Sequence, residues 1–198
     1  MAKESVSMPA GLAQIGDAAR RSATGALPPV HLWNPPFCGD IDIRIARDGT
    51  WFHEGSPIGR PALVRLFSTV LRRDPEGTML VTPVEKLRIV VDDAPFVAVE
   101  LAVASGPDGD VLRFRTNVDD WADADASHPL MFRPGAQDGV KPYLMVRHGL
   151  EAVVKRSVML ELVERGEVVD EDGASVFGVR SAGSFFPIAP ASAIEGLA

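Results

Sequence analysis

Two distant stretches of this chain follow the same plan of residues. Residues 44–61, RIARDGTWFHEGSPIGRP, pass from a strand-like run through a turn to Trp51, and then to an acid and a proline. Residues 114–130, FRTNVDDWADADASHPL, pass through an acidic turn to Trp121, and then to further acids and a proline. An internal repeat predicts two related structural units. Ligands bind preferentially at interfaces between such units, so the repeat also predicts where a ligand would lie.

Short strands dominate the apolar pattern. Residues 40–47, DIDIRIAR, alternate isoleucine with charged residues, as a half-buried antiparallel strand does. Asp48 and Gly49 then supply a hairpin turn. Further short apolar runs, separated by turn signals, occupy residues 78–82, 86–93, 96–103 and 111–117. This rhythm predicts antiparallel sheet.

An amphipathic helix is predicted in each half. In the first, Pro61 suits the first turn of a helix, and apolar residues then recur at three- and four-residue spacing. In the second, residues 149–166, GLEAVVKRSVMLELVERG, carry a broad apolar stripe, and Gly166 is placed to end the helix. Residues 8–21 predict a further short helix before a connector of small residues and prolines.

The predicted fold class is therefore α+β, with two related halves of antiparallel strands that each have one packed helix. We expect an N-terminal arm at residues 1–29, an N-terminal subdomain at residues 30–108 and a C-terminal subdomain at residues 109–198.

The composition argues against several classes of function. A net charge of -7 disfavours a nucleic acid polymer as partner, because such binding depends on clustered Lys and Arg that release counterions. Cys38 is the one cysteine, which excludes an internal disulfide and a multi-thiolate zinc site and makes the cytoplasm the simplest expected location. No run of about 18 apolar residues predicts a membrane span.

The motifs of common catalytic and cofactor sites are missing from the sequence. It contains no GxGxxG, GxxxxGK, HExxH, CxxC or GxSxG, so we assign no catalytic residue, metal ligand or cofactor. The acidic run at residues 119–125 lacks the glycine and glutamate of a calcium loop, and a solvated acidic turn is the simpler interpretation. Asp40 and Asp42 share one strand face, which suits either a magnesium ion, an acid–base pair or two solvated charges.

Two segments carry residues suited to a ligand. Within residues 31–40, HLWNPPFCGD, Trp33 could stack on a flat ring while its neighbours His31 and Asn34 hydrogen-bond it, or the segment could be a linker pinned by its aromatic residues. In an extended KPYLMVRH, positions 141, 143 and 147 share a face and offer two cations and a phenol. Solvated charge beside a buried tyrosine is the alternative interpretation.

Four strings, HLWNPPFCGDIDIRI, VEKLRIVVDDAPFVAVEL, FRTNVDDWADAD and KPYLMVRHGLEAVVKRSV, resemble an uncharacterised bacterial family, the domain of unknown function 1285. The resemblance spans residues 30–188. It implies a duplicated α+β core whose C-terminal half resembles a pleckstrin-homology-like (PH-like) barrel. It further implies a ligand site at the interface of the halves, a nucleotide-like ligand and a role in signal transduction.

The candidate ligand-binding residues lie within these strings and can stack, donate hydrogen bonds or pair with charge. They are His31, Trp33, Asn34, Asp40, Lys86, Arg88, Asn117, Asp119, Trp121, Lys141, Tyr143 and Arg147.

Three hypotheses for function follow. The leading one is a cytoplasmic binding or sensor protein that holds a small anionic, ring-bearing ligand between its halves. The second is an enzyme of unrecognised type that uses Asp40 and Asp42 or the acidic run near Trp121. The third is a module that docks a protein partner, since a PH-like fold supports many functions.

Overall fold

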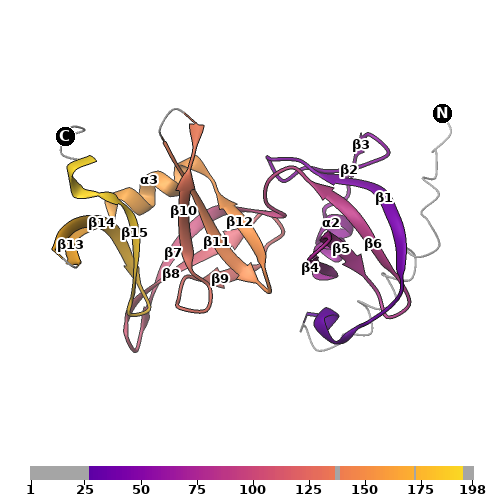
Figure 1. The fold of residues 1–198 in the computed structure, drawn as a ribbon, viewed down its shortest axis with the longest axis horizontal. Coiled ribbons are helices and arrows are strands. Elements are labelled where there is room, and N and C mark those ends of the chain that lie inside the picture. Colours follow the sequence, from indigo (N-terminus) through magenta and orange to yellow (C-terminus); the bar gives the residue numbers. More distant parts are fainter. Residues whose placement is uncertain (1–26, 137–138, 172, 194–198) are drawn as a thin grey trace. The chain divides into compact units, whose positions relative to one another are not determined.

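The computed structural model describes residues 27–136, 139–171 and 173–193, and the chain divides into two units, Met1–Asp92 and Asp93–Ala198 (Figure 1). The predicted helix at residues 8–21 lies outside the described residues. The division falls earlier than the expected boundary after Asp108. The reason is that the strand at residues 96–106 pairs only with strands of the second unit.

The N-terminal unit is one six-stranded sheet with one α-helix. Its elements are the short 3-10 helix η1 (Val30–Leu32), β1 (Phe37–Ile45), β2 (Trp51–His53), β3 (Ser56–Pro57), α2 (Pro61–Thr69), β4 (Leu71–Asp74), β5 (Gly77–Val81) and β6 (Lys86–Val91). The strand order is β3-β2-β1-β6-β5-β4, in which β1 and β6 are parallel and the other neighbours are antiparallel.

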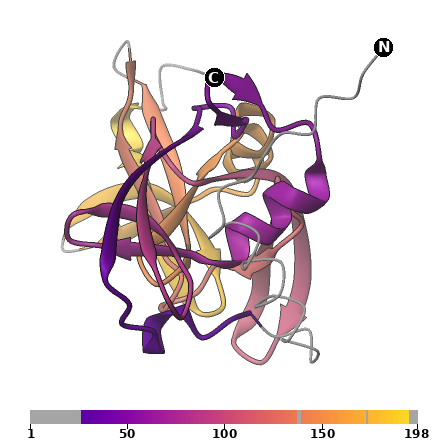
Figure 2. The same ribbon diagram turned by 90° about the vertical axis from the view of Figure 1, so that its right-hand side faces the viewer.

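The core of this unit lies between the sheet and α2, which Figure 2 shows beside the strands. Ile43 and Ile45 of β1 are buried, as the alternation predicts. Trp51 and Phe67 are each 1% exposed, and their ring centroids lie 6.2 Å apart. Helix α2 begins at Pro61, as predicted, since proline at the first helical position needs no N–H partner.

The C-terminal unit has a second six-stranded sheet, one α-helix and a three-stranded sheet. Its elements are β7 (Phe96–Gly106), β8 (Gly109–Thr116), β9 (Trp121–Asp123), β10 (Leu130–Pro134), β11 (Val140–Arg147), β12 (Leu150–Val154), α3 (Arg156–Glu164), β13 (Glu167–Glu171), β14 (Ala174–Ser181), β15 (Ser184–Pro190) and η3 (Ala191–Ala193). The order of the larger sheet is β10-β11-β12-β7-β8-β9.

Both six-stranded sheets have the same topology. Read from its other end, the second sheet runs β9-β8-β7-β12-β11-β10, which matches β3-β2-β1-β6-β5-β4 strand for strand. In each sheet the first and sixth strands are the parallel pair, so the sheets are mixed and not purely antiparallel as expected. The helix follows the third strand in the first unit and the sixth strand in the second. The predicted α+β fold with two related halves is confirmed.

Helix α3 is shorter than predicted, because residues 150–154 form β12 instead of the first helical turns. Leu150, Ala152 and Val154 are buried while the residues between them are half-buried, which is the two-residue period of a strand. His148 and Gly149 both have positive φ and turn β11 into β12. The pairing of β12 with β11 and β7 therefore outweighs the local helical pattern.

The repeated strings have the same turn but not the same place in the two sheets. Ala46 N–H donates to Thr50 O in the first turn, and Thr116 N–H donates to Asp120 O in the second. Gly49 and Asp119 take the left-handed conformation at the same turn position, with φ of 83° and 63°. Trp51, however, begins the second strand of its sheet and Trp121 the third.

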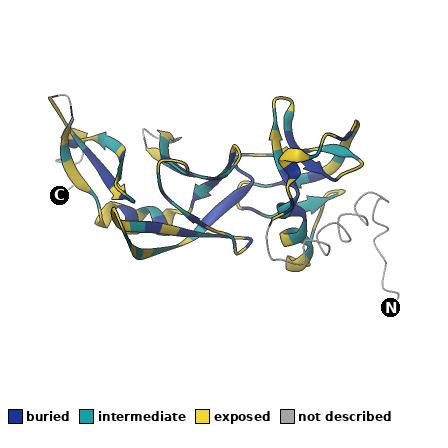
Figure 3. Ribbon diagram, turned by 90° about the horizontal axis from the view of Figure 1, so that it is seen from below, coloured by how far each residue is buried: buried dark blue, intermediate teal, exposed yellow. Residues whose placement is uncertain are grey.

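The three-stranded sheet, ordered β13-β14-β15, is an addition that the first unit does not show among its described residues. Strand β14 lies against β8 and β15 lies against β10. Figure 3 shows buried strand segments in both units. One six-stranded sheet of the protein is a half-barrel, and the three-stranded sheet packs against β8 and β10 of the second.

Candidate functional site

Lys141 and Tyr143 of β11 share a carboxylate partner, Asp93. Lys141 Nζ lies 2.5 Å from Asp93 Oδ2, and the Tyr143 hydroxyl donates to Asp93 Oδ1 at 2.7 Å. The hydrogen bond to Asp93 raises the pKa of Lys141, and burial followed by the same carboxylate raises the pKa of Tyr143. The Arg133 guanidinium lies 4.5 Å from the centre of the Tyr143 ring and also pairs with Glu151. Lys141 and Tyr143 therefore share a face, as predicted, but both side chains are already bonded to Asp93.

The third residue of that predicted face, Arg147, lies in a different cluster. Its Nη1 lies 2.6 Å from Asp120 Oδ2, and its guanidinium lies 4.8 Å from the centre of the Phe96 ring. A bulge in the pairing between Met145 and Arg147 shifts Arg147 relative to the rest of β11. Strict alternation along β11 therefore does not hold at its end.

Asn117 and Asp119 shape the turn between β8 and β9. The Asn117 side-chain oxygen accepts a hydrogen bond from Val97 N–H, and Asp119 pairs with Arg115, which also pairs with Glu100. These contacts give both residues a structural role in the turn.

Trp121 is the exposed aromatic residue among the candidates, with 45% of its surface accessible. The Arg113 guanidinium lies 5.9 Å from its ring centre and pairs with Asp123 at 2.6 Å. One face of the Trp121 ring is thus near a cation that is itself neutralised.

Asp40 and Arg88 of the first unit pair with each other across β1 and β6. Arg88 donates from Nε and Nη2 to the two carboxylate oxygens, both at 2.8 Å. This hydrogen bond lowers the pKa of Asp40. Both carboxylate oxygens of Asp40 are therefore occupied by Arg88, which weakens the enzyme hypothesis at Asp40.

Lys86 belongs to a cluster that anchors the segment before β1. Asp74 pairs with Lys86 at 2.9 Å and with Arg72 through both oxygens. Arg72 also donates to the backbone oxygens of Val30 and Trp33, at 2.9 and 2.7 Å. These bonds support the interpretation of the segment around Trp33 as an anchored linker; its neighbours His31 and Asn34 are exposed.

The acidic run forms a turn, and Cys38 lies on the surface. Asp125 accepts hydrogen bonds from the backbone N–H groups of Ser127 and His128, each at 2.7 Å, so this carboxylate caps a turn. No three His, Cys, Asp or Glu side chains of the described residues are grouped so as to hold a metal ion. Cys38 is exposed. A search of the described residues for a helix long and apolar enough to span a membrane finds none.

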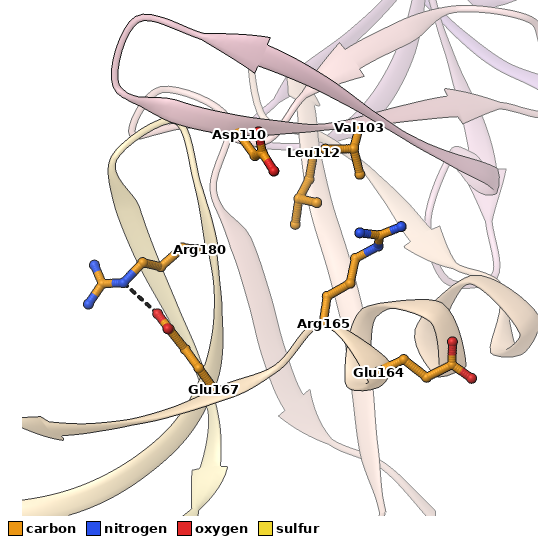
Figure 4. A pocket seen from close by; sticks show the side chains of 7 residues that line it. All are labelled: Val103, Asp110, Leu112, Glu164, Arg165, Glu167 and Arg180. Atoms are coloured by element: carbon orange, nitrogen blue, oxygen red, sulfur yellow. Dashed lines mark ion pairs between the residues drawn. The ribbon is translucent and has the colours of Figure 1, made fainter.

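An open pocket of about 420 Å³ lies within the C-terminal unit, where β8, the end of α3 and β14 meet (Figure 4). Two aliphatic and five charged residues line it: Val103, Asp110, Leu112, Glu164, Arg165, Glu167 and Arg180. None of these residues was among the candidates, because they come from five separate parts of the chain. The one sequence signal near the pocket was Gly166, which was interpreted only as the end of a helix.

The charges of this pocket are unevenly paired. Arg180 pairs with Glu167 at 2.5 Å. Arg165, Asp110 and Glu164 have no ion pair within the part of the chain that the structure describes. In Figure 4 the Arg165 side chain extends toward Val103, and Asp110 and Leu112 project from β8. Arg165 is therefore a guanidinium in a pocket with its hydrogen-bond donors available.

The walls of the pocket are fixed by buried contacts between β8 and β14. Ser181 is fully buried, accepts a hydrogen bond from Leu112 N–H at 2.8 Å and donates to Ala124 O at 2.5 Å. Ala182 N–H donates to Asp110 O at 2.9 Å. At Gly166, a Cβ atom would lie 2.0 Å from Phe177 Cζ, so only glycine fits the path from Arg165 into β13.

The fold and these sites define a two-domain α+β protein with a duplicated six-stranded sheet and a small charged pocket in its second domain. Residues 28–94 match the N-terminal domain, and residues 95–188 the C-terminal domain, of the domain of unknown function DUF1285. The chain belongs to the DUF1285 family, which confirms the resemblance seen in its strings.

Two crystal structures of family members are similar to this chain. A DUF1285 protein from Silicibacter pomeroyi DSS-3 is 49% identical, with a TM-score of 0.81 over 91% of this chain and 97% of that one. A DUF1285 protein from Shewanella baltica OS155 is 24% identical, with a TM-score of 0.52 over 63% of this chain and 91% of that one, and it supports the fold alone. No curated protein matches the chain.

Proposed function

We propose that this protein binds a small carboxylate-bearing ligand in the pocket of its C-terminal unit. The observation that carries the proposal is Arg165, whose guanidinium has no ion pair among the described residues and lines an open pocket of about 420 Å³. Pockets for small molecules have volumes of roughly 300 to 1,000 Å³ and combine apolar walls with a few polar groups. The volume of this pocket lies within that range, and its lining is mainly charged, with Val103 and Leu112 as its apolar part.

Arg165 is better suited to an incoming anion than the candidates chosen from the sequence. The guanidinium group presents a planar set of donors that matches a carboxylate with two parallel hydrogen bonds. Arg88, Lys141 and Arg147 already bind carboxylates of this chain. A ligand would have to displace those carboxylates, whereas Arg165 requires no such exchange.

The lining also bears on the kind of anion. It contains two guanidinium groups and three carboxylates, and it contains no aromatic side chain. A polyphosphate would meet those carboxylates at close range, and a nucleobase would find no ring to stack on. The pocket therefore favours a small carboxylate over the nucleotide-like ligand expected from the family resemblance.

The proposal is tested by thermal unfolding with acetate, 4-methylpentanoate, succinate, inorganic phosphate and AMP, each at millimolar concentration. A ligand at a hundred times its dissociation constant adds about 2.7 kcal/mol to the free energy of unfolding. For a chain of this length we expect a rise in Tm of roughly 5 to 10 °C. At least one carboxylate should raise Tm, and Arg165→Met should abolish the rise.

Arg156→Met is the matched control, because Arg156 begins the same helix, is exposed and lies outside the pocket. It should leave the ligand-dependent rise unchanged. A panel in which no carboxylate raises Tm would overturn the proposal, as would a rise that survives Arg165→Met.

A further inference from the structure

We infer that the ligand of this pocket is zwitterionic and aliphatic, of the size of an amino acid or a short peptide. The inference rests on the proposed function and names its ligand class. Its basis is a further lining charge without an ion pair among the described residues, the carboxylate of Asp110, together with the aliphatic side chains beside Arg165.

Asp110 and Arg165 lie in the same pocket without neutralising each other. No ion pair joins them, although the structure forms ion pairs at most of its other arginines in the described residues. Asp110 is held on β8 by the hydrogen bond from Ala182 N–H to its backbone oxygen. Arg165 is held at the end of α3, where Gly166 packs against Phe177. Each charge is thus anchored on a separate element.

A ligand that carries one ammonium and one carboxylate satisfies both groups at once. Its carboxylate would take the donors of Arg165, and its ammonium would donate to Asp110. Charge-assisted hydrogen bonds of this kind are about twice as strong as neutral ones. A simple carboxylate leaves Asp110 unpaired beside its own negative charge, and a simple amine places a second cation beside Arg165, so each meets a like charge in the pocket.

The apolar part of the ligand is indicated by Val103 and Leu112. Val103 is 38% exposed and supplies most of the accessible aliphatic surface, because Leu112 behind it is only 3% exposed. In Figure 4 Val103 lies beside the Arg165 guanidinium, and Leu112 lies on the side toward Asp110. Removing this aliphatic surface from water favours binding of an apolar group. A branched aliphatic side chain on the zwitterion fits this surface.

The test uses three probes that differ by one charged group: leucine, 4-methylpentanoate, which lacks the ammonium, and 3-methylbutylamine, which lacks the carboxylate. Binding to the full chain is measured by isothermal titration calorimetry. We expect leucine to bind at least tenfold more tightly than either of the other two probes. Arg165→Met and Asp110→Asn should each weaken leucine binding at least tenfold.

Two controls separate the pocket carboxylate from general surface charge. Asp108→Asn changes an exposed carboxylate in the turn that precedes Asp110. Glu161→Gln changes an exposed carboxylate of α3 that is not part of the pocket lining. Both variants should bind leucine within about twofold of the unaltered chain.

The outcomes distinguish this inference from the proposed function. If 4-methylpentanoate binds as tightly as leucine, depends on Arg165 and is unaffected by Asp110→Asn, the zwitterion is wrong and the carboxylate site stands. If 3-methylbutylamine is the only probe that binds, and Arg165→Met does not weaken its binding, both the inference and the proposed function are overturned. If none of the three probes binds, the inference fails, and the carboxylate panel above decides the proposed function.

Discussion

The two units share one sheet topology but differ in what was added to it. In the first, the helix α2 follows the third strand and covers a core around Trp51. In the second, α3 follows the sixth strand and leads into a three-stranded sheet. The pocket lies in the second unit, and four of its seven lining residues belong to the end of α3 or to that added sheet. The duplicated sheet is thus a scaffold, and the later elements create the candidate site.

The repeated tryptophans show how differently the two units use similar strings. Trp51 is 1% exposed and packs on Phe67, whereas Trp121 is 45% exposed beside Arg113. Both follow the same turn, with a left-handed residue two positions before the tryptophan. The resemblance of the strings reflects this turn, and the duplication is seen in the strand order instead.

The largest expected effect separates these tryptophans. Trp51→Ala removes a buried ring from the first core and should lower the free energy of unfolding by about 3 to 5 kcal/mol. Trp121→Ala removes an exposed ring and should change it by less than about 1 kcal/mol. Urea unfolding measures both values. If Trp51→Ala does not fold, the milder Trp51→Phe should still be less stable than Trp121→Ala; equal values for the two sites would contradict the comparison.

A smaller effect is expected where the three-stranded sheet contacts the six-stranded sheet of the second unit. Ser181→Ala leaves Leu112 N–H and Ala124 O without their buried partner, which should cost about 1 to 3 kcal/mol. Hydrogen exchange at Leu112 should become faster, because its amide loses an acceptor.

Ser175→Ala is the control for this junction, since Ser175 lies on the same strand and its hydroxyl bonds an exposed Asp170. Its effect should be under about 0.5 kcal/mol. Unchanged exchange at Leu112 in Ser181→Ala would show that the added sheet is held by other contacts.

The smallest expected effects give the two units opposite pH dependence. The hydrogen bond from Arg72 lowers the pKa of Asp74 in the first unit. A carboxyl with a lowered folded pKa adds stability above its unfolded value, near 3.8, and loses it as pH falls through the folded pKa. Asp74→Asn should therefore remove part of the acid sensitivity of the first unit.

In the second unit, the raised pKa values of Lys141 and Tyr143 act at the other end of the scale. Their stabilisation is complete below the unfolded value of Tyr143, 10.0, and is lost as pH rises through the folded pKa values. Tyr143→Phe should remove part of this alkaline sensitivity. Each effect should be under about 1 kcal/mol, as for partly exposed ion pairs. Hydrogen exchange of residues 37–91 and 96–190 against pH measures them separately, and identical profiles would contradict the difference.

Short sequence patterns correctly predicted the helices and strands that depend on residues close together in the chain. Pro61 marked the start of α2, and the alternation around Ile43 marked β1. The same patterns failed at residues 150–154, where a run compatible with a helix forms a strand because it pairs with β11 and β7. Pairing partners far along the chain are not visible in a local pattern.

The candidate site residues were likewise predicted where they are neighbours in the sequence and missed where they are far apart. Lys141 and Tyr143 lie together because they are two positions apart on one strand. Their partner Asp93 is 48 and 50 residues away, so its ion pair with Lys141 and its hydrogen bond from Tyr143 could not be foreseen. Arg165 and Asp110 were missed for the same reason, since neither belongs to a pattern until α3 and β8 meet.

The sequence by itself determined the family, the α+β class, the existence of two related halves and the residues that turn the chain. Those properties depend on side-chain periodicity and backbone conformation within a few residues. Only the tertiary structure decided the strand order, the mixed sheets and the pocket. Strand pairing and charge pairing join residues far apart in the chain, and their free energy depends on which groups meet after the chain has folded.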